Sequence, residues 1–260
     1  MEVAQRVVRK KKGKDMMRVG LIGYGAMSRQ VLERLEEVYD MECAGIVSSS
    51  PMGTALSLEE LAGQLDVVID FSHPDNLAMI VDFVKHHPIP LVLATTGYSE
   101  EQIAEVRKIA QVVPVVFAAN CSLGVTVMAR IVGEVSRVLG DTFDIEIIEK
   151  HHHKKLDAPS GTAKMLADAV DPEGEYARKY GRSGYDKRQK EIGIHAVRGG
   201  SITGEHTVMF AGSDEVLEIT HKAGSKQIYA NGALRAARYL KDRQPGLYDM
   251  SDVLFGTTEQ

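Results

Sequence analysis

The stretch RVGLIGYGAMSRQVLERLEEV, residues 18–38, decides the fold of this chain. A short apolar run ends at Gly23, and apolar residues then recur at helical spacing as far as Val38. Gly23 and Gly25 suit a tight turn from a strand into a helix, and they let a phosphate approach the backbone closely. The helix that follows would offer free N–H groups and the positive end of its dipole to that phosphate. The stretch therefore predicts a nucleotide-binding turn; the alternative is a glycine turn that binds no ligand.

The same alternation of strand and helix continues to residue 122. We expect further strands at 41–47, 66–71, 90–95 and 112–118, separated by helices at 58–65, 74–85 and 99–110. Strands that are apolar throughout, between amphipathic helices, indicate a parallel sheet that is covered on both faces. The predicted fold class of this half is α/β, a Rossmann-type doubly wound parallel sheet.

A different pattern follows residue 122. We expect helices at 123–139, 160–170 and 225–241, a strand at 143–151, and a polar loop at 171–190. Three further runs, at 191–198, 205–211 and 215–221, alternate apolar and polar residues as antiparallel strands do. The second half is therefore predicted to be an α+β domain with a mostly antiparallel open sheet. We expect the last helix to pack back on the first half.

Composition excludes several classes of protein. The 260 residues are 44% hydrophobic and 26% charged, and no apolar run approaches the ~20 residues of a membrane span. Two cysteines cannot form a disulfide framework, which fits a reducing cytoplasm. Residues 1–15 carry a net charge of +4 and the remainder −9, and Trp is absent, so we expect neither nucleic acid nor a membrane as partner. We interpret residues 1–15 as a disordered extension before Met16 and Met17; a basic arm or a cleaved targeting segment is the alternative.

Three strand ends complete the predicted coenzyme site, because ligands of such sheets bind at the carboxyl ends of the strands. The second strand ends in serines at 48–50, without a carboxylate to repel a 2′-phosphate and without an arginine to attract one. This favours NADPH and leaves NADH as the alternative; the serines could also form only a solvated turn. The residues expected to contact the coenzyme are Gly23, Tyr24, Gly25, Ala26, Met27, Ser48, Ala94, Thr95, Thr96, Ala118, Ala119, Asn120 and Cys121.

The segment EKHHHKKLDAPSGT, residues 149–162, concentrates the groups that can carry chemistry. On a strand, His151 and His153 would share one face. Residues 160–162 begin a helix, whose N–H groups suit a carboxylate or phosphate. Together with the lysines they predict a pocket for a small anionic substrate, with Lys155 or a histidine supplying a proton. A metal site lacks supporting carboxylate or cysteine spacing, and we predict none; a solvated basic face is the other alternative.

At this segment the chain resembles the 4-hydroxy-tetrahydrodipicolinate reductase family, also called dihydrodipicolinate reductases, of lysine biosynthesis. The run that carries the resemblance consists of Glu149, His151, His152, Lys155, Asp157, Ala158, Pro159, Ser160, Gly161 and Thr162. The resemblance extends over 17–256 and includes IDF at 69–71, TTG at 95–97, FAAN at 117–120, Arg198, Gly200, GEH at 204–206, ITHKA at 219–223 and ANGA at 230–233.

The resemblance implies reduction of a cyclic dicarboxylate by a nicotinamide coenzyme. It assigns His151 as acid/base and Lys155 as proton donor, while His152, Gly161 and Thr162 hold substrate carboxylate. It also implies a homotetramer formed through the second domain. The expected domains are a dinucleotide-binding domain at 16–122, a substrate-binding and oligomerisation domain at 123–232, and a C-terminal helix and tail at 233–260.

The chain departs from the family pattern in the coenzyme half. The glycine turn is one residue shorter than the commonest form and lacks an arginine, and no acidic residue follows the second strand. Ser28 replaces the third glycine, Ala94 stands where glycine is usual, and Cys121 where an aromatic residue is common. These departures concern coenzyme preference more than the reaction. The rival functions are a different dicarboxylate oxidoreductase and a non-catalytic nucleotide-binding sensor; the presence of both His151 and Lys155 argues against the sensor.

Overall fold

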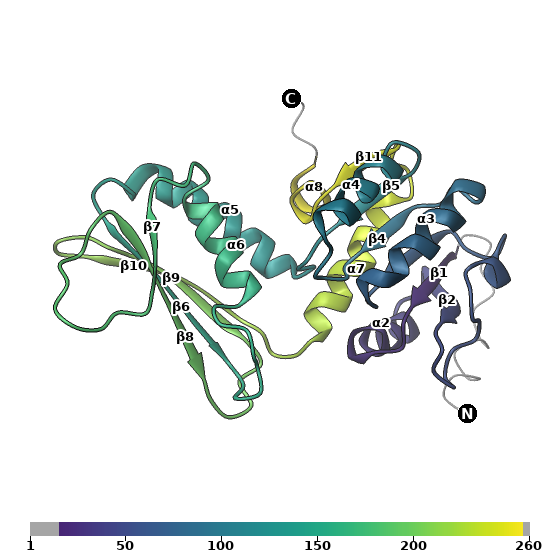
Figure 1. The fold of residues 1–260 in the computed structure, drawn as a ribbon, viewed down its shortest axis with the longest axis horizontal. Helices are drawn as coiled ribbons and strands as arrows, with labels where there is room; N and C mark the ends of the chain where they lie inside the picture. Colours follow the sequence, from purple (N-terminus) through teal and green to yellow (C-terminus); the bar gives the residue numbers. More distant parts are fainter. Residues whose placement is uncertain (1–15, 257–260) are drawn as a thin grey trace. The chain divides into compact units, whose positions relative to one another are not determined.

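The computed structural model describes residues 16–256, so the extension predicted at 1–15 lies outside the described residues. The chain forms two compact units (Figure 1). The first unit contains the chain up to Leu123 and again from Gln227 onward, and the second unit is the continuous segment Gly124–Lys226.

A six-stranded sheet forms the centre of the first unit. Its strands lie in the order β11-β5-β4-β3-β1-β2, and every neighbouring pair is parallel. The strands are β1 (Met17–Ile22), β2 (Met41–Val47), β3 (Val67–Asp70), β4 (Leu91–Leu93), β5 (Pro114–Phe117) and β11 (Gly246–Tyr248). Because β1 lies between β2 and β3, the order of the strands reverses there, which is where doubly wound sheets bind their ligands.

Helices cover both faces of this sheet, as its apolar strands require. On one face, α2 (Ala26–Glu37), α7 (Gln227–Leu240) and α8 (Met250–Phe255) share a core with β1, β3 and β4. On the other face, the short helix η1 (Glu59–Leu61), α3 (Leu77–His86) and α4 (Glu100–Ile109) enclose a second core; η2 (Pro74–Asn76) leads into α3.

Helix α7 returns the chain to the first unit. Its buried face consists largely of small residues, which allow a close approach to the sheet. At Gly232 a Cβ would lie only 1.6 Å from the backbone oxygen of Cys121, so this position has no room for a side chain. The whole helix therefore packs with the first unit, and the boundary expected at 232/233 falls inside it.

The second unit has a five-stranded sheet with one helical layer (Figure 1). Its strands lie in the order β10-β9-β6-β8-β7, with β6 (Asp144–His151), β7 (Ala177–Tyr180), β8 (Glu191–Arg198), β9 (Glu205–Ala211) and β10 (Val216–Lys222). Helices α5 (Leu123–Leu139) and α6 (Gly161–Val170) share the core on one face of the sheet. Within residues 124–226, no helix covers the other face.

The predicted fold class is confirmed, and the second sheet is mixed. Strand β9 runs antiparallel to both β10 and β6, whereas β8 runs parallel to β6 and β7. Strand β7 lies within the segment 171–190 that was predicted to be a loop; it is a short, polar edge strand without the alternation that marks the others. No helix in the described part of the chain combines the length and the apolar character needed to cross a bilayer.

Candidate active site

The turn between β1 and α2 lies at the carboxyl edge of the first sheet. Gly23 has a φ of +84°, and its N–H donates to the carbonyl oxygen of Val47 at 2.9 Å. A Cβ on Gly25, the N-cap of α2, would meet no atom of the described chain within 4 Å. Among the described residues no side chain caps α2, and its first turn has no acidic residue. The open backbone and the helix dipole therefore suit the pyrophosphate of a dinucleotide.

A buried carboxylate organises the neighbouring strand ends. Asp70, the last residue of β3, accepts hydrogen bonds from the Ser72 hydroxyl at 2.5 Å and the Tyr98 hydroxyl at 3.1 Å. The Ser72 N–H also donates to the Thr95 hydroxyl at 2.8 Å, which links the ends of β3 and β4. Burial raises the pKa of Asp70 despite these hydrogen bonds. The prediction from sequence did not include Asp70, although IDF at 69–71 places a carboxylate at the end of an apolar strand.

The other predicted coenzyme residues lie at the same edge, because all parallel strands end there. The exposure of these residues differs. The exposed positions are Gly25, Ala26, Thr96 and Ala119, and the half-buried ones are Gly23, Tyr24, Met27, Ser48 and Asn120. The buried positions are Ala94, Thr95, Ala118 and Cys121. Cys121 packs in the core against α7, and burial raises the pKa of its thiol to about 12. At the end of β2, the Ser48 hydroxyl accepts the Ser50 N–H at 3.1 Å.

In the second unit, β6 carries a carboxylate on its buried face. Side chains alternate along β6, so Ile147, Glu149 and His151 all face the core. Glu149 is 0% exposed, and its two oxygens accept both terminal nitrogens of Arg198, each at 2.7 Å. They also accept Nδ1 of His151 at 2.5 Å and the backbone N–H of Ser160 at 3.0 Å. Burial opposes ionisation of Glu149, but these hydrogen bonds outweigh it and hold its pKa below the usual value.

The strand ends at His151, so the expectation that His151 and His153 share a strand face is wrong. The chain turns immediately: the Lys155 N–H donates to the carbonyl oxygen of His152, and the His153 N–H donates to that of Gly200. His151 is buried, whereas His153 is exposed on the turn. Period-two alternation applies only while the backbone stays extended.

The structure distinguishes the two lysines that follow. Lys155 is 22% exposed, and its ammonium lies 2.8 Å from Oδ1 of Asp157. Lys154 is exposed. The hydrogen bond from Lys155 lowers the pKa of Asp157, and the Asp157 carbonyl oxygen accepts Arg198 at 2.6 Å. Lys155 is therefore held in place, on a loop that is tied to Arg198.

The N-terminus of α6 lies beside this loop. Ser160 is the N-cap, with its hydroxyl accepting the Ala163 N–H at 3.2 Å, and the first turn of α6 has no acidic residue. A Cβ on Gly161 would meet no atom of the described chain within 4 Å, and Thr162 is half-buried. Partial burial and nearby positive charges lower the pKa of His152. An anion would meet the positive end of the helix dipole beside Gly161 here.

His206 on β9 joins the same cluster. Its Nε2 lies 3.0 Å from the Ser160 hydroxyl, and its ring meets that of His151 edge-on, with centroids 5.1 Å apart. Burial lowers the pKa of His206 to about 4. Sequence reasoning gave His206 and Arg198 no role. Their signal is indirect: a carboxylate on the buried face of β6 needs partners from neighbouring strands.

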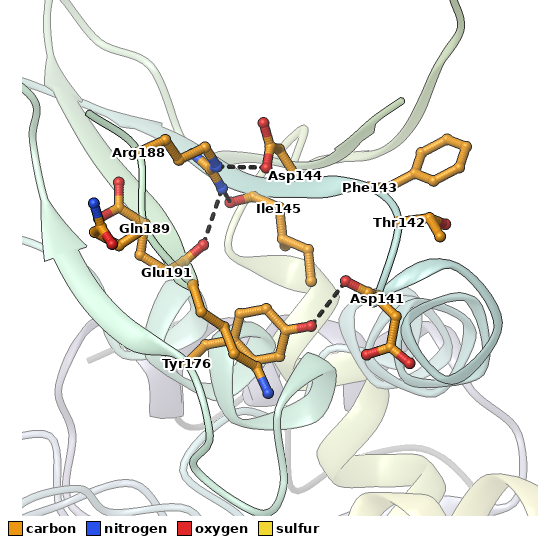
Figure 2. Close-up of a pocket in the computed structure, with 11 residues that line it drawn as sticks. Asp141, Thr142, Phe143, Asp144, Ile145, Tyr176, Arg188, Gln189 and Glu191 are labelled. Carbon is orange, nitrogen blue, oxygen red and sulfur yellow. Dashed lines mark hydrogen bonds and ion pairs between the residues drawn. The ribbon is translucent and has the colours of Figure 1, made fainter. Parts of the chain in front are cut away.

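A cavity of about 330 Å³ lies at the opposite end of the same sheet (Figure 2). It is near Asp144, where β6 begins, roughly 23 Å along the strand from His151 at about 3.3 Å per residue. Its polar groups bind one another: Arg188 donates to the carbonyl oxygen of Glu191 at 2.9 Å, and the Tyr176 hydroxyl to that of Gly140 at 2.8 Å. The cavity is therefore separate from the histidine cluster. Across residues 16–256, no three His, Cys, Asp or Glu side chains are grouped so that they could hold a metal ion.

Comparison with known proteins covers both units. Residues 17–121 match the family model described as "Dihydrodipicolinate reductase, N-terminus", and residues 124–254 match "Dihydrodipicolinate reductase, C-terminus". The chain is 42% identical over 250 residues to 4-hydroxy-tetrahydrodipicolinate reductase from Clostridium tetani, covering 92% of this chain and 97% of that protein. It is also 42% identical over 244 residues to the reductase of the same name from Staphylococcus aureus strain JH9, covering 91% and 100%.

A solved structure shares the fold. Dipicolinate-bound dihydrodipicolinate reductase from Paenisporosarcina sp. TG-14 superposes with a TM-score of 0.78 at 22% identity, covering 92% of this chain and all of that one. The family matches span both units and the relatives match over nearly their whole length. This chain therefore belongs to the dihydrodipicolinate reductase family.

Proposed function

We propose that this chain reduces 4-hydroxy-tetrahydrodipicolinate to tetrahydrodipicolinate with NADPH or NADH, a step of diaminopimelate and lysine biosynthesis. The observation that carries the proposal is the cluster of His151, His152 and Lys155 beside the N-terminus of α6, in a member of this family. The overall reaction consumes a hydride and a proton, and the hydroxyl group of the substrate leaves as water. The nicotinamide coenzyme, when bound, supplies the hydride.

The substrate would be held by its negative charge. Gly161 and Thr162 at the N-terminus of α6 would donate to one carboxylate, with His152 as a further donor. The ammonium of Lys155, which lies 2.8 Å from Oδ1 of Asp157, adds positive charge on the adjoining loop. This combination favours a small dicarboxylate over a neutral ligand.

The proton would come from this cluster as well. Lys155 is the proton donor of the proposal and His151 the acid/base group, as the family resemblance implies. The 2.5 Å hydrogen bond from His151 to buried Glu149 fixes the imidazole, and a fixed group transfers a proton more effectively than a mobile one.

The coenzyme would bind at the carboxyl edge of the first sheet. The residues present fit a dinucleotide, because Gly25 leaves open space at the start of α2. Residues 23–27 would hold the pyrophosphate, Ser48 the ribose, and residues 94–96 and 118–121 the nicotinamide half. We propose that NADPH binds at least as tightly as NADH, since residues 48–50 contain no carboxylate to oppose a 2′-phosphate.

We further propose a cytoplasmic homotetramer that assembles through the uncovered face of the second sheet. Both cysteines are free and buried, which fits a reducing compartment. The outer strand β10 exposes Val216 and Leu217, which a second copy of the chain could cover. Multi-angle light scattering of the purified protein tests the assembly: a monomer at micromolar concentration would contradict it.

The decisive experiment for the reaction is coenzyme oxidation with freshly generated 4-hydroxy-tetrahydrodipicolinate. We expect absorbance at 340 nm to fall only when this substrate, coenzyme and protein are all present. Turnover with other keto or amino dicarboxylates instead would favour a different oxidoreductase, and coenzyme binding without any turnover would favour a sensor.

Calorimetric titration with both coenzymes tests the proposed preference for NADPH. A tenfold advantage for NADH, about 1.4 kcal/mol, would contradict it.

A further inference from the structure

Glu149 has contacts that a structural ion pair does not need. A buried Arg–carboxylate pair is satisfied by two parallel hydrogen bonds, which Arg198 supplies. Glu149 Oε2 additionally accepts Nδ1 of His151, and Oε1 accepts the N–H of Ser160. One carboxylate thus joins the end of β6, the end of β8 and the N-cap of α6. These are the elements that carry His151 and the proposed carboxylate-binding residues.

The chemistry of Glu149 decides where the protons of His151 lie. A carboxylate that accepts four hydrogen bonds has no hydrogen to give, so Nδ1 of His151 must carry one. In the neutral ring, the other nitrogen, Nε2, then carries the lone pair that can accept a proton. A Cβ on residue 204 would lie 3.1 Å from this nitrogen, so a side chain in place of Gly204 would crowd it.

We infer that Glu149 is a positioning residue, which holds His151 in the tautomer with hydrogen on Nδ1 and so makes Nε2 the atom that exchanges protons with the substrate. The inference rests on the proposed function only for the identity of the substrate. The tautomer of His151 follows from the hydrogen bonds alone. The charged and titratable groups around the ring are Glu149 on β6, Arg198 on β8, His206 on β9, and His152 and Lys155 on the loop. Among these, Glu149 is the group hydrogen-bonded to Nδ1.

The tautomer can be measured without any substitution at Glu149. The protein is labelled with ¹⁵N-histidine, and the signal of His151 among the nine histidines is identified by its loss in His151→Gln. At a pH where the imidazole is neutral, we expect the Nδ1–H form to dominate. A dominant Nε2–H form would overturn the inference, even if the protein proved to be an active reductase. Absence of turnover would instead count against the proposed function and leave the tautomer result standing.

The substitution Glu149→Gln tests the consequence for catalysis, and β6 provides a matched control. Glu146 also contacts a histidine, His195 Nε2 at 2.7 Å, and an arginine, Arg188, but at the other end of the strand. We expect Glu149→Gln to change the tautomer ratio of His151 and to lower kcat by about 10²- to 10⁴-fold, with NADPH affinity unchanged. Glu146→Gln should leave kcat unchanged.

The outcomes separate a positioning role from a merely structural one. A folded Glu149→Gln variant with the wild-type tautomer, or with wild-type kcat, would overturn the inference. So would equal losses of kcat in Glu149→Gln and Glu146→Gln, because these would reflect general damage to the sheet. If Glu149→Gln does not fold, the tautomer of the wild-type protein still decides the question.

Discussion

His206 should make the stability of the second unit depend on pH. Its side chain is 4% exposed, and burial lowers its pKa to about 4, against about 6.5 in an unfolded chain. At pH 7 the histidine is neutral in the folded chain and mostly neutral in the unfolded chain. As the pH falls below 6.5, His206 binds a proton in the unfolded chain but stays neutral in the folded chain until about pH 4. The free energy of unfolding therefore decreases.

The two pKa values set the size of this effect. Between pH 7 and pH 5 the linkage relation gives a loss of about 2 kcal/mol, rising to about 3 kcal/mol at pH 4 and below. Other groups also titrate on acidification, so the measurement is a comparison of variants. In His206→Gln, whose amide can still reach the Ser160 hydroxyl, this part of the pH dependence should disappear.

Urea unfolding followed by circular dichroism at pH 5, 6 and 7 provides the measurement. The difference in pH dependence between wild type and His206→Gln should be about 2 kcal/mol over this range. His153→Gln, which alters an exposed histidine on the nearby turn, is the control and should retain the wild-type pH dependence. If wild type and His206→Gln lose the same stability between pH 7 and pH 5, the argument from burial is refuted.

Three further substitutions test the two units separately. Lys155→Ala should lower kcat by about 10²- to 10⁴-fold with little change in NADPH affinity, whereas Lys154→Ala should have a small effect; equal small effects in steady-state kinetics would contradict a role for Lys155 as proton donor. Gly25→Val places a side chain in open space, so thermal unfolding should change little while calorimetry shows weaker NADPH binding; unchanged binding would contradict the pyrophosphate site. Gly232→Ala forces a Cβ against the backbone of Cys121 and should destabilise the protein by about 1–3 kcal/mol in urea unfolding; wild-type stability would contradict this close packing.

Local sequence patterns predicted five of the six strands of the first unit, but neither β11 nor α8. Apolar strands and amphipathic helices follow one another at regular intervals, and a parallel sheet brings all carboxyl ends to one edge. The glycine turn at residues 23–25 and the serines after β2 were therefore placed correctly at that edge. The contacts of Asp70 with Tyr98 depend on a partner 28 residues away, which no local pattern reveals.

The second unit shows what local patterns omit. Alternation predicted strands β8, β9 and β10, but alternation is the same whether a strand pairs parallel or antiparallel, so the mixed pairing was not predicted. The site is also assembled over long separations: Arg198 lies 49 residues from Glu149, and His206 lies 46 residues from Ser160. The roles proposed for His151 and Lys155 come from family resemblance, whereas the residues that contact them were found only in the three-dimensional structure.

The return of α7 to the first unit has a consequence for the order in which a newly made chain can fold. The core of the first sheet needs Ala233, Ala237 and Leu240, which leave the ribosome after the entire second unit. The second unit is a single continuous segment and holds all of its own strands. During synthesis, the first unit therefore begins to form first but is completed last. One apolar face of its sheet stays without α7 while about a hundred intervening residues are added.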